Sequence, residues 1–308
     1  MKADIQQAGA RLKAGKLVAL PTETVYGLGA NALDGKAVAS IYATKGRPSF
    51  NPLIVHIASV EKAKEFAVFT PLAAQLAHRF WPGPLTMVLH RVPDCPLSEL
   101  VSAVLDTVAI RLPAHPVMRD VLETCGLPIA APSANRSGKI SPTTAQHVAE
   151  EFTHDDVMIV DGGPCTVGLE SAVVDATGDV PVLLRYGSIT AEEIAQACGH
   201  QPAMPTQTDT PVSPGMLLKH YAPTKPLRLD ATDAKEDEAL LGFGPDAPAN
   251  AALNLSPRGD LREAAANLFA YLRKLDSEHD CEAIAAMPIP NEGLGIAIND
   301  RLERAARK

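Results

Sequence analysis

Short apolar runs alternate with amphipathic segments through the first two thirds of the chain. Apolar runs of five to seven residues that end at Gly, Pro or polar residues are typical of strands. The pattern predicts strands at residues 17–21, 53–57, 85–90, 107–113, 127–131, 157–161, 171–175 and 181–185. So many strands within one domain indicate a large mixed sheet.

Helical patterns separate several of these predicted strands. Helix-start signals stand at Asp34 and Ser59, and the pair Ser141-Pro142 places a proline in a first turn. The first fifteen residues also have the periodicity of an amphipathic helix. Alternating strands and helices predict an α/β domain over residues 1–198.

A change of composition follows this domain. Residues 199–214 are rich in Pro, Thr and Gln and lack periodicity, and we expect a linker over 199–225. The remainder, 226–308, predicts a strand, a Pro- and Ala-rich loop, an amphipathic helix over 261–275, a strand in AIAAM and a terminal helix. This order predicts a second, smaller α/β domain of Rossmann-like type.

Composition and charge exclude several classes of protein. The net charge is −8 and only 4% of residues are aromatic, so we expect no broad basic face for nucleic acid or anionic lipid. The five cysteines include no C-x-x-C pair, which argues against a disulfide framework or a zinc site and indicates a reducing compartment. No apolar run has the length of a membrane span, so we expect a cytoplasmic protein without a membrane partner.

The segment KGRPSFNPLIVHI combines two cations with a predicted strand. Lys45 and Arg47 flank a glycine ahead of two prolines that exclude a helix, so we expect both side chains on a stiff loop, converging on one anion. His56, within the strand, faces the same pocket or is an ordinary half-buried histidine. Arg111 lies in an apolar strand, and it pairs with a carboxylate of the protein or binds an anionic ligand.

Three further segments are rich in small polar residues. PTETVYGLGANA follows the first strand, where an α/β protein collects ligands, although a tight turn has the same composition. APSANRSGKISP has the hydroxyls, amide and backbone donors of a phosphate cradle, or is a plain surface loop. DGGPCTVGLESAVVD is a glycine-rich loop that leads into a strand. Because motifs for a covalent nucleophile are lacking, these groups predict phosphoryl or nucleotidyl transfer by positioning and charge neutralisation.

These motifs together, with WPGPLTMVL, IRLPAHP, LLRYGSI and SPGMLLKHYAP in this order, resemble the YrdC-like family of threonylcarbamoyl-AMP synthases in its long, two-domain form. The resemblance covers nearly the whole chain and implies a large twisted mixed sheet. It implies that L-threonine, bicarbonate or CO2, and ATP with Mg2+ give threonylcarbamoyl-AMP and pyrophosphate. The product would pass to the machinery that modifies tRNA beside the anticodon, and direct contact of the chain with tRNA stays open.

The resemblance also implies roles for individual residues. Its K-x-R pair, taken as catalytic, falls on Lys45 and Arg47. Its threonine site falls on Thr24, His56, Arg111 and Ser171. Its ATP site falls on Arg47, Asn51, Thr107, Ser133, Asn135, Ser141, Arg185 and Tyr221. No protein ligand for the metal is expected, and Lys219, His220 and Tyr221 would close the site as part of a lid.

Two alternatives stay open at this point. An RNA-binding module without catalysis would show a steep dependence of binding on salt. A different carbamoyl or acyl adenylate-forming enzyme on the same fold would exchange pyrophosphate with ATP in the presence of another amino acid.

Overall fold

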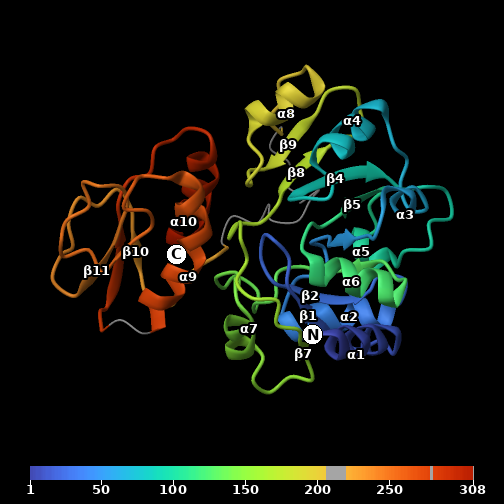
Figure 1. Cartoon of the computed structure of the whole chain (residues 1–308), viewed down its shortest axis with the longest axis horizontal. Coiled ribbons are helices and arrows are strands. Elements are labelled where there is room, and N and C mark those ends of the chain that lie inside the picture. Colours follow the sequence, from blue (N-terminus) through green and yellow to red (C-terminus); the bar gives the residue numbers. More distant parts are fainter. Residues whose placement is uncertain (206–219, 278–279, 308) are drawn as a thin grey trace.

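The chain folds into two domains, each with its own sheet. The computed structural model describes residues 1–205, 220–277 and 280–307. The smaller, C-terminal domain lies beside the larger one, with its helices α9 (Leu261–Ser277) and α10 (Leu294–Ala306) on the side toward the larger domain (Figure 1). The expected α/β class and the second domain are confirmed.

Nine of the described strands form the sheet of the larger domain. They are β1 (Val18–Leu20), β2 (Gly27–Asn31), β3 (Ile54–His56), β4 (Leu85–His90), β5 (Thr107–Arg111), β6 (Ile129–Ala130), β7 (Met158–Ile159), β8 (Ala172–Asp175) and β9 (Val182–Arg185). Their order is β7-β1-β2-β6-β3-β5-β4-β8-β9. Three pairs are parallel, β1 with β7, β3 with β5 and β4 with β8, and the others are antiparallel. The sheet is therefore mixed, as predicted.

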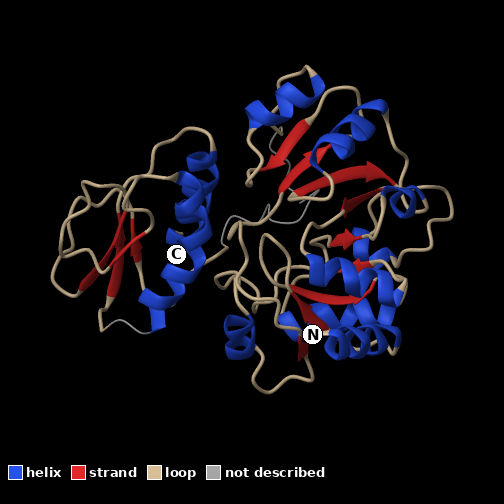
Figure 2. Cartoon of the chain, viewed as in Figure 1, coloured by secondary structure: helices blue, strands red, loops and turns tan. Residues whose placement is uncertain are grey.

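Helices cover both faces of this sheet (Figure 2). They are α1 (Lys2–Lys13), α2 (Gly35–Lys45), α3 (Val60–Lys64), α4 (Pro71–Phe80), α5 (Glu99–Ser102), α6 (Pro116–Cys125), α7 (Ala145–Glu151) and α8 (Ala191–Cys198). Val18 and Leu20 pack with α1 and α6, whereas Ala19 between them packs with the core on the other face. This alternation is the period of two that a strand imposes. In the described part of the chain, no helix has the length and apolar character needed to cross a membrane.

Local signals explain where the helices next to the polar loops begin and end. The Asp34 carboxylate accepts the amide of Lys36 at 2.9 Å and caps α2, as the sequence predicts. The helix ends at Gly46, whose φ of 62° suits glycine. Lys45 is therefore the last residue of a helix, and the expectation that it lies on a loop is wrong.

One other local expectation is also wrong, and one open alternative is decided. Helix α7 begins at Ala145 with Thr144 as its cap, because the hydroxyl of Thr144 accepts the amide of His147, so Ser141-Pro142 lies before the helix. Residues 27–31 make the strand β2, whereas the sequence left a ligand-binding loop and a tight turn open for this segment. A Cβ on Gly29 would lie 2.9 Å from the side chain of Ile129. Close packing between strands, which the local sequence does not reveal, explains this glycine.

The C-terminal domain has a parallel sheet. Its strands β10 (Leu227–Arg228), β11 (Glu238–Gly242), β12 (Leu253–Asn254) and β13 (Ala283–Ala286) have the order β10-β13-β11-β12. Three strands precede α9 in the described residues, where the sequence predicted one. The core of this domain includes Val25, Ile140 and Leu169 of the larger domain. The two domains therefore share an apolar interface, and that interface lies beside the loops that the sequence singled out.

Gly187 offers a test of the packing that places Ser171. A Cβ at this position would lie 2.1 Å from the backbone nitrogen of Ala172. We expect Gly187→Ala to lower the free energy of unfolding by about 1–3 kcal/mol, because the backbones of two neighbouring segments must separate. Urea unfolding measures this change. Gly178→Ala is the matched control, since Gly178 is exposed with no atom near the added Cβ, and an equal loss there would contradict the explanation.

Candidate active site

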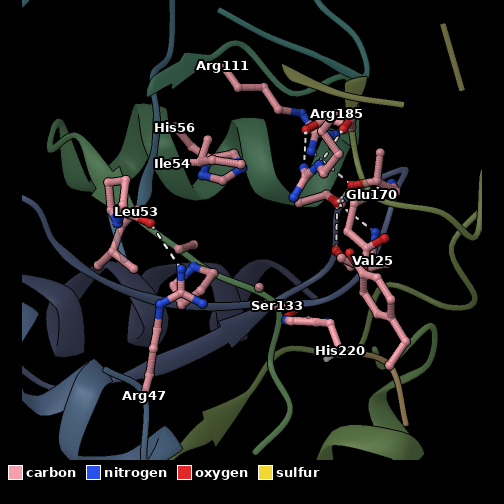
Figure 3. A pocket seen from close by; sticks show the side chains of 18 residues that line it. Val25, Arg47, Leu53, Ile54, His56, Arg111, Ser133, Glu170, Arg185 and His220 are labelled. Atoms are coloured by element: carbon pink, nitrogen blue, oxygen red, sulfur yellow. Dashed lines mark hydrogen bonds between the residues drawn. The ribbon is translucent and has the colours of Figure 1, made fainter. Parts of the chain in front are cut away.

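A pocket lies where the ends of several strands of the larger sheet meet the loops named above and the segment between the two domains. Its lining residues are Thr22, Thr24, Val25, Gly27, Arg47, Pro52, Leu53, Ile54, His56, Arg111, Ala131, Pro132, Ser133, Glu170, Ser171, Arg185, His220 and Tyr221. Figure 3 shows Arg111, Arg185 and Glu170 gathered on one side of the pocket and Arg47 on the other. Three guanidinium groups around one pocket suit an anionic ligand.

Eight of the predicted site residues line this pocket. They are Thr24, Arg47, His56, Arg111, Ser133, Ser171, Arg185 and Tyr221. Sheet pairing brings two of them together, because the parallel register of β3 and β5 places His56 opposite Arg111. The chain segments that carry the eight are far apart in sequence, so only the fold assembles the pocket.

Arg111 has the carboxylate partner that the sequence left open. Its guanidinium contacts Glu23 at 2.6 Å and donates to the Thr24 hydroxyl at 2.9 Å. The second oxygen of Glu23 accepts the amides of Ala114 and His115. Burial acts to raise the pKa of Glu23, but the charge and hydrogen bond of Arg111, with the amide of Ala114, outweigh it and leave that pKa below its ordinary value. The pair therefore holds the Arg111 guanidinium in place at the pocket wall.

Ser171 is held by hydrogen bonds from two sides. The Arg185 guanidinium donates to the Ser171 hydroxyl and carbonyl oxygens, each at 3.1 Å. The hydroxyls of Thr86 and Ser171 are 2.7 Å apart. A buried hydroxyl with fixed partners has a defined orientation, and Ser171 is thus preorganised to contact a ligand.

The two cations of the K-x-R segment occupy different positions. Arg47 lines the pocket and donates to the Pro52 carbonyl at 3.0 Å, and its Nε has no partner among the described residues. Desolvation lowers the pKa of Arg47 to about 10, so it stays charged at neutral pH. Lys45 is buried behind the wall, where its ammonium donates to the carbonyls of Ser133 and Asn135. The structure therefore separates the pair that the sequence predicted would converge, because α2 continues through Lys45.

Four predicted ATP-site residues do not line the pocket. Asn135 and Ser141 are buried beside it, with the Asn135 amide donating to the carbonyls of Arg136 and Lys139. Asn51 is buried, and neither of its side-chain polar atoms has a partner among the described residues. Thr107 lies opposite His90 at the start of β5, four residues from Arg111. A strand rises by about 3.3 Å per residue, so Thr107 is at the far end of the strand from the pocket.

His56 is a neutral side chain in this pocket. Burial, with the nearby charge of Arg111, lowers its pKa to about 3. Its Nδ1 has no hydrogen-bond partner among the described residues, and neither does Nδ1 of His220. Buried polar atoms are nearly always paired in folded proteins. Unpaired atoms that cluster here mark the pocket as a place for a polar ligand.

Two other kinds of chemistry receive no support from the geometry. Burial raises the pKa of Cys165 to about 12, which opposes a thiolate nucleophile. The described residues include no group of three His, Cys, Asp or Glu side chains that could hold a metal ion. Both oxygens of Glu170, the pocket carboxylate, already accept hydrogen bonds, from Ser141 and Arg301. The site is built from cations, hydroxyls and backbone groups.

Sequence reasoning missed Glu170 and Arg301. Glu170 stands beside Ser171 in the glycine-rich segment already singled out, so its position was a usable signal. Arg301 gave no signal, because an arginine on an amphipathic helix is ordinarily a solvated surface residue. Lys219, the third residue of the expected lid, lies outside the described residues.

Comparison with known proteins shows similarity over nearly the whole chain. The family described as "Telomere recombination" matches residues 10–187, and "Threonylcarbamoyl-AMP synthase, C-terminal domain" matches residues 189–307. The chain is 43% identical to the threonylcarbamoyl-AMP synthase of Bacillus subtilis, with 98% of this chain and 92% of the relative covered. It is also 43% identical to that of Pyrococcus abyssi, with 98% and 94% covered. A solved structure, P. abyssi Sua5 complexed with L-threonine, aligns with a TM-score of 0.89 at 40% identity, covering 98% of this chain and 94% of that one.

The buried pair of Glu23 and Arg111 predicts a pH-dependent stability. A carboxylate whose folded pKa is lowered stabilises the fold above its ordinary pKa of 4.5, and this contribution is lost as the pH falls through the lowered pKa. We expect Glu23→Gln to cost about 3 kcal/mol at pH 7, because Arg111 loses its buried counterion. The difference between wild type and variant should shrink as the pH falls below 4.5.

Urea unfolding at pH 7, 4.5 and 3.5 measures that difference. Glu61→Gln is the matched control, since Glu61 is exposed on α3. A difference between wild type and Glu23→Gln that is small at pH 7, or constant across this range, would show that the pair is not charged in the folded protein.

Proposed function

Because this chain belongs to the threonylcarbamoyl-AMP synthase family, we propose that it forms threonylcarbamoyl-AMP and pyrophosphate from L-threonine, bicarbonate or CO2, and ATP. The observation that carries the proposal is the pocket itself, where three arginines and the hydroxyls of Thr24, Ser133 and Ser171 surround one cavity. A carboxylate and a polyphosphate are the anions that such a set of donors suits.

L-Threonine is proposed to occupy the side of the pocket formed by Thr24, His56, Arg111 and Ser171. Support comes from the relative whose structure was solved with L-threonine, which aligns over nearly the whole chain. The hydroxyls of Thr24 and Ser171 have fixed partners, and His56 is neutral, so these groups offer hydrogen bonds without a change of charge. Because Arg111 already pairs with Glu23, its remaining N–H groups would contact the substrate carboxylate.

ATP is proposed to contact Arg47, Ser133, Arg185 and Tyr221 of the pocket lining. Lys45 would act from behind, by holding the carbonyls of Ser133 and Asn135 and hence the loop that faces the phosphates. Asn51 and Ser141 remain proposed ATP-site residues of the supporting layer. Thr107 also remains a proposed ATP-site residue, at the end of β5 opposite to that of Arg111.

The proposed reaction has two steps. The threonine amine, in its neutral form, attacks the carbon of CO2, and loss of a proton from nitrogen leaves a carbamate. An oxygen of this carbamate attacks the α-phosphorus of ATP, and the bond to the bridging oxygen breaks to release pyrophosphate. Arg47 and Arg185 would neutralise the charge that develops on the departing pyrophosphate, which is the main contribution a protein makes to such transfers.

Magnesium is proposed to enter with ATP. The ion prefers phosphate oxygens and water, and in such sites it takes few ligands from the protein. The ion would neutralise phosphate charge. The residues proposed to contact L-threonine and ATP would orient the two substrates.

The pocket is partly open to solvent, and the segment between the domains borders it. His220 and Tyr221 form the part of the wall contributed by the segment between the domains. We propose that this segment covers the pocket during the reaction and keeps the short-lived carbamate away from water. The product is proposed to leave for the enzymes that attach threonylcarbamoyl groups to tRNA.

Pyrophosphate release from ATP and Mg2+ tests the proposal directly. The assay is run with L-threonine and bicarbonate each present or omitted, and with a panel of other amino acids. Release that requires both supports the proposed reaction. Release that requires neither would indicate an ATP hydrolase. Preference for another amino acid would indicate a different adenylate-forming enzyme. No release under any condition would contradict the proposal.

The separated positions of Arg47 and Lys45 predict different effects of their substitution. Arg47→Ala should lower kcat/KM for ATP about 10²- to 10³-fold, as loss of a charge-stabilising donor does, with little change in stability. Lys45→Met should lower activity and also cost about 1–3 kcal/mol of stability, because two buried carbonyls lose their donor. Pyrophosphate release and urea unfolding measure the two effects. Arg79→Ala, an exposed arginine on α4, is the control, and full activity of Arg47→Ala would exclude its role.

A further inference from the structure

Arg301 is a fully buried arginine contributed by the C-terminal domain. It lies on α10, and its side chain has no exposed surface. Its Nε contacts the Glu170 carboxylate at 3.2 Å and its Nη1 contacts Asp300 at 2.9 Å. Burying a guanidinium is costly unless its partners are well placed. A charge buried at this position therefore requires a specific arrangement of the residues around it.

The Glu170 partner connects Arg301 to the pocket. Glu170 lines the pocket next to Ser171, and its other oxygen accepts the hydroxyl of Ser141. One carboxylate thus joins α10 of the C-terminal domain to two loops of the larger domain. The loop that carries Gly168 packs closely against α9, since a Cβ on Gly168 would lie 2.5 Å from the backbone of Ala266.

The aromatic ring of Tyr221 is the second contact that Arg301 makes at the pocket. The guanidinium carbon lies 5.5 Å from the ring centroid, within the range of a cation–π contact. The ring also stacks on Phe269 of α9, with 5.3 Å between the ring centroids. Tyr221 is buried and has a φ of 65°, unusual for a residue other than glycine, and such a conformation persists only where the surroundings hold it. The C-terminal domain therefore supports the Tyr221 ring through α9 and α10.

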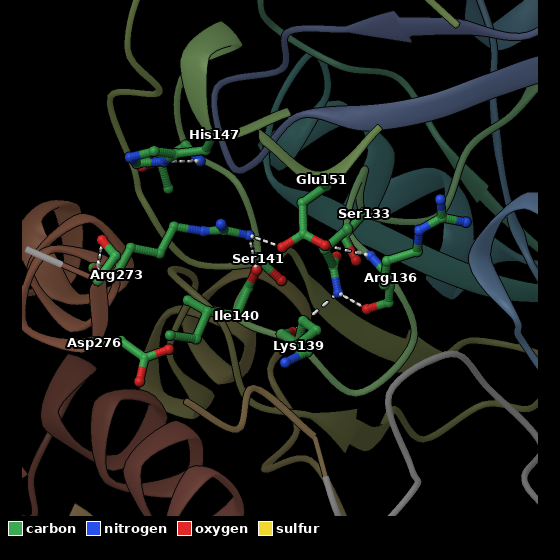
Figure 4. Close-up of polar contacts among 12 residues, drawn as sticks. Ser133, Arg136, Lys139, Ile140, Ser141, His147, Glu151, Arg273 and Asp276 are labelled. Carbon is green, nitrogen blue, oxygen red and sulfur yellow. Dashed lines mark hydrogen bonds and ion pairs between the residues drawn. The ribbon is translucent and has the colours of Figure 1, made fainter. Parts of the chain in front are cut away.

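A separate ion pair links the same domain to the loop around Ser133 and Asn135. Arg273 of α9 contacts Glu151 at 2.8 Å, and the second oxygen of Glu151 accepts the amide of Arg136 at 3.0 Å. Figure 4 shows Glu151 between the two arginines. Both helices of the C-terminal domain thus contact residues that support the pocket, from two directions.

We propose that the C-terminal domain is a structural part of the active site, and that Arg301 is a positioning residue that holds Glu170 and the ring of Tyr221 against the pocket. The inference rests on the proposed function only for the identity of the ligand. Glu170 holds the hydroxyl of Ser141, and Ser141 and Tyr221 are both proposed ATP-site residues. Loss of Arg301 should therefore affect ATP more than L-threonine.

Hydrogen–deuterium exchange of the full chain without ligand gives the first test. In Arg301→Met, amides of segments 138–142 and 168–172 in the larger domain should exchange about tenfold faster than in wild type, because opening of these loops is no longer opposed by the ion pair. Arg304→Met is the matched control, since Arg304 lies one turn further along α10 and contacts Asp300 at 2.9 Å. Unchanged exchange in Arg301→Met, or the same increase in Arg304→Met, overturns the proposal.

Steady-state pyrophosphate release gives the second test. Arg301→Met should raise the KM for ATP about tenfold and the KM for L-threonine less than threefold, and Arg301→Lys should recover part of the loss because it keeps the charge beside Glu170. Equal changes in both KM values, or a change confined to kcat, contradict a role at the nucleotide side. A wild-type protein that releases no pyrophosphate refutes the proposed function, and the exchange experiment then still decides the role of Arg301.

Glu170→Gln tests the same pair from the opposite side, should Arg301→Met fail to fold. It should increase exchange over residues 298–304 of α10, in the other domain. If the amides of residues 298–304 exchange at the wild-type rate in Glu170→Gln, the contact between Glu170 and Arg301 does not stabilise α10, and the proposal is overturned.

Discussion

The ion pair between Arg111 and Glu23 is the interaction on which the arrangement of the pocket depends. It joins the loop after β1 to the end of β5, and the same carboxylate accepts two amides at the start of α6. Breaking a buried pair leaves a charge without compensation, which costs about 3–5 kcal/mol. The carboxylate therefore fixes three segments at once, and the pocket forms where they meet.

Other buried polar groups around the pocket also need partners at defined positions. Glu170 pairs with Arg301, Arg273 pairs with Glu151, and Lys45 donates to two carbonyls. Each contact crosses between segments that are distant in the sequence. Because a buried charge tolerates few geometries, these contacts define positions more strictly than apolar packing does. The acidic net charge of the chain is compatible with a cationic pocket, since the cations are local and enclosed.

The C-terminal domain has its own parallel sheet and core, yet its helices complete the surroundings of the pocket. Val25, Ile140 and Leu169 of the larger domain pack into the core of the smaller one. Membership of the threonylcarbamoyl-AMP synthase family extends across both domains. The domains are therefore joined by more than a linker. Separating them would expose apolar residues and break buried ion pairs, and both changes cost free energy.

The sequence by itself determined the α/β class, most of the strands, the capped start of α2 and the segments that carry the pocket residues, because these depend on local periodicity, capping and composition. Only the tertiary structure decided that β2 is a strand, that Lys45 supports the wall while Arg47 lines the pocket, and that Thr107 lies far from it. It also decided that Arg301 is buried against Glu170. Such facts depend on contacts between distant segments, and a local pattern carries no information about which buried charge meets which partner.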